Sequence, residues 1–590
     1  MNMNSQMDAR AALADAMTPE ERRRLQAVYE PRVTAVPLSN AWMDLCMMPD
    51  GEIRCYGHRG ETRVYLSSRD GGLSWKEYDV PDKTRLCAAM RCPWSGRWVA
   101  SYCVEGEGGF QGAEMPQPPQ EAHGWQAVLS DEGPGGRVSW VKISDLNVRC
   151  PRFPLALRSR RRILICGNLM DKPMRPVVAR SDDDGRTWQT ACLEGAPMHT
   201  VSWPHQGLRW QNGSCEASIV ERADGSLYML ARTSQDYHYE YESFDGGETW
   251  TAPRPSPFHA TLTMPTLLRL SDGRILTFWC NTQPLPELDK TTLWPPMNPG
   301  EISGMGGEDV FTNRDANHCA VSYDEGRSWR GFRELLLNPV RNASDFRTRG
   351  GNAGSLDKSV HQFQALELPY GKVLLVCGQH ALSRKILVFD PNWLLETARE
   401  EDFHEGLLNV STQIYLKSVS GNIRTRSGHC AWNRTSGAVL MPDPDGNYEE
   451  ALYIQASADP RLFCEMQGVA WNFPAAARGE VEVLLRPGEE DSVVTLTDRW
   501  FNPCDATADA LSPYSVRLSQ TALKKDAWNH VKLVWDGEAC HVLANGDEAA
   551  CLRAACAYPN GLSYLLIQSA EHAGGRGTYV KWMKMAAREG

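Results

Sequence analysis

The sequence predicts an all-β protein in which a six-bladed β-propeller is followed by a second β domain. A Ser-x-Asp-x-Gly-x-x-Trp motif occurs four times, and a turn that leads into a short apolar strand occurs six times. Alternating strand patterns continue after the last repeat. Internal repeats of this kind indicate an architecture of equivalent units. At 590 residues the chain is too long for one hydrophobic core, so two or more domains are expected.

The first repeat predicts a tight turn between strands. Its copies are Ser68-Asp70-Gly72-Trp75, Ser181-Asp183-Gly185-Trp188, Ser243-Asp245-Gly247-Trp250 and Ser322-Asp324-Gly326-Trp329, and a degenerate copy spans Ser130 to Trp140. The Asp and Ser side chains can accept backbone N–H bonds within the turn, Gly can take a positive φ, and Trp can pack between strands. We therefore expect the four Asp residues of the motif to be structural.

The second repeat sets the number of units. Apolar strands follow a turn position at Gly51, Gly96, Arg161 (in the Gly slot), Gly225, Gly273 and Gly371. The first five each precede a full or degenerate copy of the Asp motif, and the sixth leads to KILVFDPNWL, which could close a ring. Six hairpin units predict six four-stranded blades around an axis, over residues 32–404.

Residues 1–31 predict a helical extension that packs as an arm. Thr18 stands at an N-cap, Pro19 at the first helical position and Glu21 at the capping-box position. The following RRRLQAVY predicts that one helix continues to Pro31.

After about residue 405 the Asp motif stops and different strands begin. Residues 528–546 predict a strand, an Asp-Gly turn and a second strand, and residues 580–585 predict a closing strand. This pattern resembles the laminin-G or concanavalin-like β-sandwich. The resemblance implies a jelly-roll domain over residues 405–590 that either binds glycans or packs against its neighbour.

Composition and charge exclude several classes of partner. The net charge of −11 argues against nucleic acid, because phosphate binding needs a basic face. No leader-like pattern opens the chain and no apolar run is long enough to span a bilayer, so we expect a cytoplasmic protein without a membrane partner. The eighteen Cys are scattered singly, without metal-ligand spacing. We therefore expect buried thiols, no metal and no cofactor, and the sequence allows a homo-oligomer.

The repeated turn resembles the Asp box of sialidases (neuraminidases), and the six units over residues 32–400 resemble their propeller. The Asp box is specific to the fold rather than to an activity. The resemblance implies an exo-acting glycoside hydrolase that releases sialic acid or a related acidic keto-sugar from glycans.

The repeat register predicts which side chains face the axis. Equivalent positions in each unit should point the same way, and two such positions lie nine residues before and seven residues after each turn. They hold Trp42, Cys87, Arg152, Glu216, Met264 and Gln362, and His58, Cys103, Asn168, Arg232, Cys280 and Gly378. These rings form a polar pocket with excess positive charge. Because a guanidinium pairs with a carboxylate, we expect an anionic ligand.

The resemblance assigns roles to several of these positions. Glu216 begins the fourth blade, where the family has the carboxylate that activates a neutral nucleophile. Arg232 and Arg314 match two of the three arginines that bind the substrate carboxylate. Trp42 occupies the register of the third, and Arg152 could supply the missing charge. Asn168 and Gln362 complete the expected substrate-binding set.

The sequence also departs from the family pattern. The catalytic Asp expected after the first turn strand is absent, and that loop offers His58 and Glu61 as proton donors. His361 and Gln362 stand where the nucleophilic Tyr is expected. Either the neighbouring Tyr237 moves in, or water attacks with His361 or Glu216 as base, which would invert the anomeric centre.

Two other functions fit the same sequence. Propellers with His and Arg at the axis could cleave uronate-containing chains as a uronate-directed glycosidase or a polysaccharide lyase. The missing Tyr and Asp also fit a non-catalytic glycan-binding protein.

Overall fold

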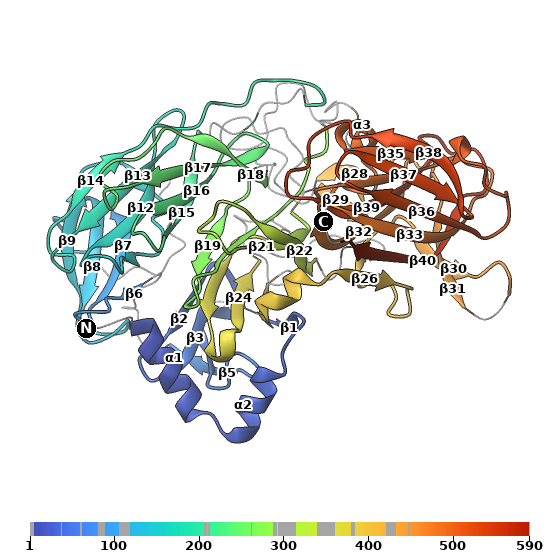
Figure 1. Cartoon of the computed structure of the whole chain (residues 1–590). Helices are drawn as coiled ribbons and strands as arrows, with labels where there is room; N and C mark the ends of the chain where they lie inside the picture. Colours follow the sequence, from blue (N-terminus) through green and yellow to red (C-terminus); the bar gives the residue numbers. More distant parts are fainter. Residues whose placement is uncertain are drawn as a thin grey trace.

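Six small antiparallel sheets follow one another along the first two-thirds of the chain in the part that the computed structural model describes. The described residues are 5–36, 38–59, 62–80, 89–104, 118–205, 209, 213–260, 262–286, 292, 314–338, 341, 360–378, 384–419, 432–446 and 449–588. In these sheets most strands that follow one another in the sequence are hydrogen-bonded neighbours. The molecule is therefore all-β with a few short helices (Figure 1).

The strands of the first three sheets are β2 (Ser39–Met47), β3 (Ile53–Arg59), β4 (Thr62–Ser68) and β5 (Lys76–Asp79); β6 (Met90–Arg91), β7 (Trp98–Val104), β8 (Gly124–Ser130) and β9 (Ser139–Ser144); and β10 (Val148–Arg149), β11 (Leu155–Ala156), β12 (Ile163–Leu169), β13 (Arg175–Ser181) and β14 (Gln189–Cys192). Those of the next three are β15 (Cys215–Glu221), β16 (Leu227–Arg232), β17 (Tyr237–Ser243) and β18 (Arg254–His259); β19 (Thr266–Arg269), β20 (Ile275–Trp279), β21 (Ala316–Ser322) and β22 (Arg330–Leu337); and β23 (Gln364–Glu367), β24 (Val373–Cys377) and β25 (Lys385–Phe389) with β1 (Arg32–Ala35).

The sixth sheet joins the beginning and the end of this region. β1 pairs antiparallel with β25, and Arg32 lies opposite Val388. The sequence predicted that the KILVF segment could close a ring, and this segment is β25. Its partner β1 has four residues and no repeat motif, and it was not predicted.

Both sequence repeats lie at equivalent places in the sheets. The six apolar segments are the second strands β3, β7, β12, β16, β20 and β24, and the Ser of each Asp motif is the last residue of a third strand. In the third copy, Asp245 Oδ1 accepts the N–H bonds of Glu248 and Thr249 at 2.9 and 3.0 Å, and Ser243 Oγ accepts that of Gly247 at 2.9 Å. The motif Asp thus bonds within its own turn, as predicted.

Two helices precede β1 and pack against the first and sixth sheets. They are α1 (Ser5–Ala16) and α2 (Pro19–Gln26), and Leu13 and Leu25 are buried among residues of these sheets. The predicted capping box at Thr18 is present. The prediction of one helix to Pro31 is wrong, because the Tyr29 carbonyl accepts the Asp390 N–H at 3.0 Å and the chain then enters β1.

Two larger sheets follow, and they lie to one side of the six small sheets in Figure 1. The first has the order β30-β31-β40-β33-β36-β37-β38 with β26 on β40, and the second has the order β27-β32-β39-β34-β35. They share one hydrophobic core, in which Trp471 and Leu565 of one sheet pack with Val483 and Leu533 of the other. The predicted hairpin and closing strand are present as β36, β37 and β40.

The elements of this region are β26 (Ala398–Glu401), β27 (Val410–Ser411), β28 (Ile414–Val419), β29 (Trp432–Thr435), β30 (Val439–Pro442), β31 (Glu450–Ile454), β32 (Gly468–Ala476), β33 (Gly479–Arg486), β34 (Ser492–Thr497), α3 (Ala508–Leu511), β35 (Tyr514–Arg517), β36 (Asn529–Trp535), β37 (Ala539–Ala544), β38 (Asp547–Arg553), β39 (Leu562–Ser569) and β40 (Thr578–Ala587), and short 3₁₀ turns occupy Pro369–Gly371, Pro391–Leu395 and Leu518–Gln520. β26 lies before residue 404, where the predicted domains divide, and it pairs with β40 of the larger sheet.

The two regions also contact each other through buried polar groups. Gln283 N–H donates to the Trp500 carbonyl, and Trp500 N–H donates to the Asn281 carbonyl, both at 2.9 Å. The hairpin β28–β29 contributes Arg434, whose ion pair with Asp315 is fully buried. The described cysteines are free thiols, and nine of them are buried. No helix in the described ranges is long and apolar enough to cross a membrane.

Candidate active site

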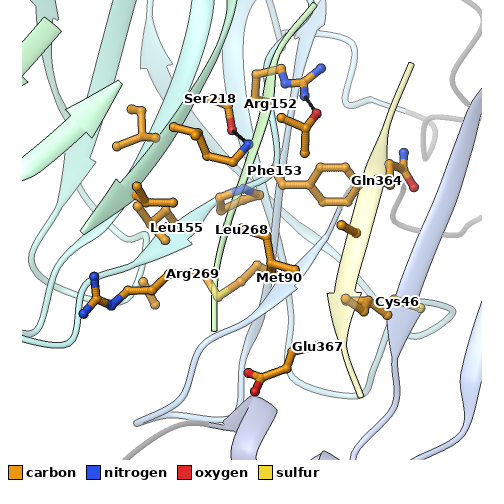
Figure 2. Close-up of a pocket in the computed structure, with 18 of the residues that line it drawn as sticks. Cys46, Met90, Arg152, Phe153, Leu155, Ser218, Leu268, Arg269, Gln364 and Glu367 are labelled. Carbon is orange, nitrogen blue, oxygen red and sulfur yellow. Dashed lines mark hydrogen bonds between the residues drawn. The ribbon is translucent and has the colours of Figure 1, made fainter. Parts of the chain in front are cut away.

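The first strands of all six sheets line one cavity of about 320 Å³. The lining comes from β2, β6, the Arg152–Ala156 segment that ends in β11, β15, β19 and β23. Figure 2 shows side chains from these strands around the same space. The six sheets therefore surround a common region.

Glu216 lies at the beginning of β15, beside this region, and is buried. Its Oε2 accepts a hydrogen bond from Arg232 Nη1 at 2.8 Å, and its backbone N–H donates to Asn168 Oδ1 at 2.7 Å. The three residues come from three strands, and the repeat register predicted that all three would face the axis. The structure brings them together.

The charges around Glu216 favour its ionised form. Burial acts to raise the pKa of this carboxyl, but the nearby Arg232, Arg152 and Arg314 outweigh that effect and hold the pKa below its usual value. Each of these arginines was predicted to bind the substrate carboxylate. Among the described residues they act on one carboxylate, so this cluster keeps a net positive charge that suits an anionic ligand.

Arg314 and His361 form the second half of the cluster. Arg314 is buried, its Nη2 donates to the Leu262 carbonyl, and its Nη1 lies 3.3 Å from His361 Nε2. Because a guanidinium only donates, Nε2 of His361 accepts this bond and the imidazole is neutral. Gln362 Nε2 also lies 3.3 Å from the same nitrogen. The residue at the position of the family's Tyr thus presents a basic lone pair to an arginine.

Several residues at the entrances to the first strands have left-handed backbone conformations. Glu216 has φ 45° and Gln362 has φ 70°, and Cys150 and Leu262 have φ 48° and 53°. Residues other than Gly rarely adopt such backbone angles, and backbone strain of this kind clusters at functional sites. Two of the four residues, Glu216 and Gln362, were predicted site residues.

Arg152 lies between the Glu216 cluster and the cavity. Its Nη2 donates to Thr266 Oγ1 at 3.4 Å, and its Nη1 contacts Met264 Sδ. Figure 2 shows Arg152 at one end of the cavity, next to Phe153. Met264 and Arg152 occupy equivalent positions of the predicted ring, which explains why they meet.

The remaining predicted site residues are not part of the described cluster. His58 lies on β3 and Trp42 on β2, but their side chains are outside the described part of the structure, as is all of Glu61. Tyr237 begins β17 and its ring packs on His259, with the centroids 4.5 Å apart. Burial raises the pKa of Tyr237, so its hydroxyl stays protonated in this arrangement.

Two neighbours of the cluster were not predicted. His238 is buried, and its Nε2 lies 2.9 Å from the Thr263 carbonyl oxygen. Burial lowers the pKa of His238 to about 4, and the charge of Arg232 acts in the same direction. Burial raises the pKa of the Cys150 thiol to about 12, so it is not a nucleophile. His238 directly follows Tyr237 near the start of a third strand, and this position is the sequence feature that could have indicated its place beside the cluster.

The cluster can bind an anion and provide a base. It combines three guanidinium groups, one ionised carboxylate and one neutral imidazole. Within the described residues, the one group with the spacing of metal ligands is His541, Glu548 and Cys551, and it lies on β37 and β38, away from this cluster.

Comparison with known proteins adds a family model for part of the chain. Residues 141–330 match a BNR repeat-like domain. This segment contains Arg152, Asn168, Glu216, Arg232 and Arg314, and three of the four complete Asp motifs. No curated protein matches the chain significantly in sequence.

Solved structures resemble the chain only distantly. Trypanosoma rangeli sialidase in complex with sialic acid is 10% identical, with a TM-score of 0.35 over 96% of this chain and 95% of that one. A protein of unknown function from Dyadobacter fermentans is 16% identical, with a TM-score of 0.34 over 61% of this chain and 97% of that one. With TM-scores this low, these similarities do not decide the fold or the activity.

Proposed function

We propose that the protein is an exo-acting glycoside hydrolase that releases sialic acid or a related acidic keto-sugar from glycans. The observation that carries the proposal is the position of Glu216, 2.8 Å from Arg232 and within the field of Arg152 and Arg314. A site with three guanidinium groups and one carboxylate fits a sugar that carries its own carboxylate.

The proposed architecture is a six-bladed β-propeller over residues 32–404, followed by a concanavalin-like β-sandwich over residues 405–590. The cavity that all six first strands line supports the propeller. The shared core of the two larger sheets supports the sandwich.

In the proposed reaction the substrate carboxylate binds Arg232 and Arg314. It competes with Glu216 for Arg232, so the Glu216 carboxylate is released towards the anomeric centre. Water then attacks, and Glu216 or His361 accepts its proton. Attack by water without a covalent intermediate inverts the anomeric configuration. We propose His58 or Glu61 as the proton donor to the leaving group.

Replacement of Glu216 tests the role of its carboxylate. Glu216→Gln keeps the shape and removes the charge, and we expect turnover of a fluorogenic sialoside to fall about 10²- to 10⁴-fold. Glu240→Gln is the matched control, because Glu240 bonds to Tyr228 of β16 and Arg254 of β18, is not part of the Glu216 cluster and should not change turnover. Unchanged turnover in Glu216→Gln rejects the proposed role. Proton NMR of the first product anomer measures the stereochemistry.

His361 gives reason to test a second substrate class. A neutral imidazole beside Arg314 could remove a proton next to a uronate carboxylate, as a lyase requires. An unsaturated uronate absorbs in the ultraviolet, so an absorbance rise on a uronate polymer would favour the lyase over the hydrolase. Tight binding of an acidic glycan without product after long incubation would favour a non-catalytic glycan-binding protein.

A further inference from the structure

The cavity along the first strands has apolar walls, with Arg152 at one end and the charged Arg269 and Glu367 at the other (Figure 2). Met90, Phe153, Leu155 and Leu268 line it, and Arg152 lies at its inner end in Figure 2. Ala9 and Arg10 of α1 contribute to the lining as well. Ligand pockets typically measure about 300–1,000 Å³ and combine apolar walls with a few polar groups, and this cavity matches that description.

Arg152 differs from the other cavity-lining arginines whose partners are defined. Arg10 pairs with Glu367, Arg158 with Glu221, and Arg269 with Glu325. Arg152 instead contacts a thioether and a hydroxyl, and no carboxylate of the described residues lies within ion-pair distance of it. A guanidinium with such weak hydrogen-bond partners beside an apolar space is stabilised most by a carboxylate ligand, because a carboxylate can accept two parallel N–H bonds.

We propose that this cavity binds an amphipathic monocarboxylate, with the carboxylate on Arg152 and the hydrocarbon chain against Phe153, Leu155 and Leu268. Arg152 has no ion-pair partner among the described residues and selects one negative charge, whereas Arg269 and Glu367 at the other end are already paired with Glu325 and Arg10. The site shares Arg152 with the proposed sugar site but extends along the cavity away from Glu216. The residues after Glu216 on β15 line the cavity, whereas Glu216 itself does not. Binding can therefore be measured without any glycosidase activity.

Hexanoate, hexanol and hexylamine are suitable probes, because they share a chain and differ in charge. We expect calorimetric titration of the full chain to show one hexanoate per molecule and no hexylamine binding. Arg152→Met removes the charge and keeps the length, and it should weaken hexanoate about tenfold or more. Leu268→Trp should block binding by filling the space, even if Arg152→Met folds poorly. Arg254→Gln is the matched control, because Arg254 pairs with Glu240 and does not line the cavity, and it should bind hexanoate normally.

Three results overturn the proposal. The first is a wild-type protein that does not bind hexanoate at millimolar concentrations. The second is equal binding of hexanol and hexanoate, which would make the cavity merely apolar. The third is normal hexanoate binding by a folded Arg152→Met or Leu268→Trp variant. None of these results depends on whether Glu216 supports catalysis.

Discussion

Asp315 and Arg434 form an ion pair with no exposed side-chain surface, 3.0 Å from Oδ1 to Nη2. Arg434 Nε also donates to Asp315 Oδ2 at 3.0 Å, and the Tyr415 hydroxyl donates to the same oxygen. Asp315 directly follows Arg314 of the candidate site, whereas Arg434 and Tyr415 belong to the hairpin β28–β29. The second part of the chain thus supports the backbone that positions a predicted substrate-binding residue.

Removing Arg434 should therefore destabilise the fold strongly. In Arg434→Met, Asp315 would remain as a buried charge without its cation, and we expect a loss of about 3–5 kcal/mol in the free energy of unfolding. Urea denaturation measures the loss. Arg461→Met, which breaks the exposed pair with Asp459, should leave the free energy of unfolding nearly unchanged. Similar values for both variants would contradict the buried pair's importance.

The Asp motifs should contribute to stability and not to chemistry. Asp245→Ala leaves the N–H groups of Glu248 and Thr249 without their acceptor, and we expect a loss of about 1–3 kcal/mol in unfolding free energy. Turnover per folded molecule should stay at the wild-type level. Asp171→Ala, which removes a surface pair with Arg175, provides the comparison. A catalytic defect in folded Asp245→Ala would refute the structural role.

The acid limb of the activity profile should depend on Arg152. Because Arg152 helps to hold the pKa of Glu216 below its usual value, Arg152→Met should raise that pKa. The carboxylate would then be protonated at higher pH, so the acid limb of kcat/KM should move upward in pH. Arg269→Gln should leave the limb in place. If the acid limb does not move in Arg152→Met, the limb reports the titration of a group other than Glu216.

Stability should fall between about pH 4.5 and 7 because of Glu334. Burial raises the pKa of Glu334 from 4.5 to about 7, although its Oε1 accepts a 2.6 Å bond from the Tyr564 hydroxyl. A carboxyl with a raised pKa in the folded state stabilises the fold most below its unfolded pKa, and this stability is lost as pH rises through the folded pKa. Glu334→Gln should therefore show a smaller drop in Tm from pH 5 to 8 than wild type. The exposed Glu538→Gln should reproduce the wild-type drop.

The repeats made the first half of the structure predictable from sequence. Each Asp motif fixes a turn between two strands, so counting residues from the turns predicts that Asn168, Glu216 and Arg232 face the same region. In the structure these three residues are joined by hydrogen bonds. The same counting placed Arg152 and Met264 in one ring, but no local pattern indicated that these two side chains contact each other. Register arguments succeed here because equivalent strands repeat the same geometry.

Other features had no local signal. The strand β1 contains only RVTA, and its existence depends on pairing with β25, 350 or more positions away. The ion pair of Asp315 and Arg434 likewise depends on how a distant hairpin packs. α1 lacks a clear apolar stripe, and its Leu13 is buried because it packs against the first and sixth sheets. Tertiary contacts, rather than propensity, decide such elements.

The pairing of β1 with β25 also imposes an order on biosynthesis. On the ribosome, β1 emerges early, yet its hydrogen-bonding partner is translated only after the intervening five sheets. A nascent chain must therefore hold this strand unpaired for tens of seconds at ordinary elongation rates, or shelter it with a chaperone. Closure of the last sheet is then a late, long-range step, and interrupted synthesis before Lys385 would leave an open-edged product prone to aggregate.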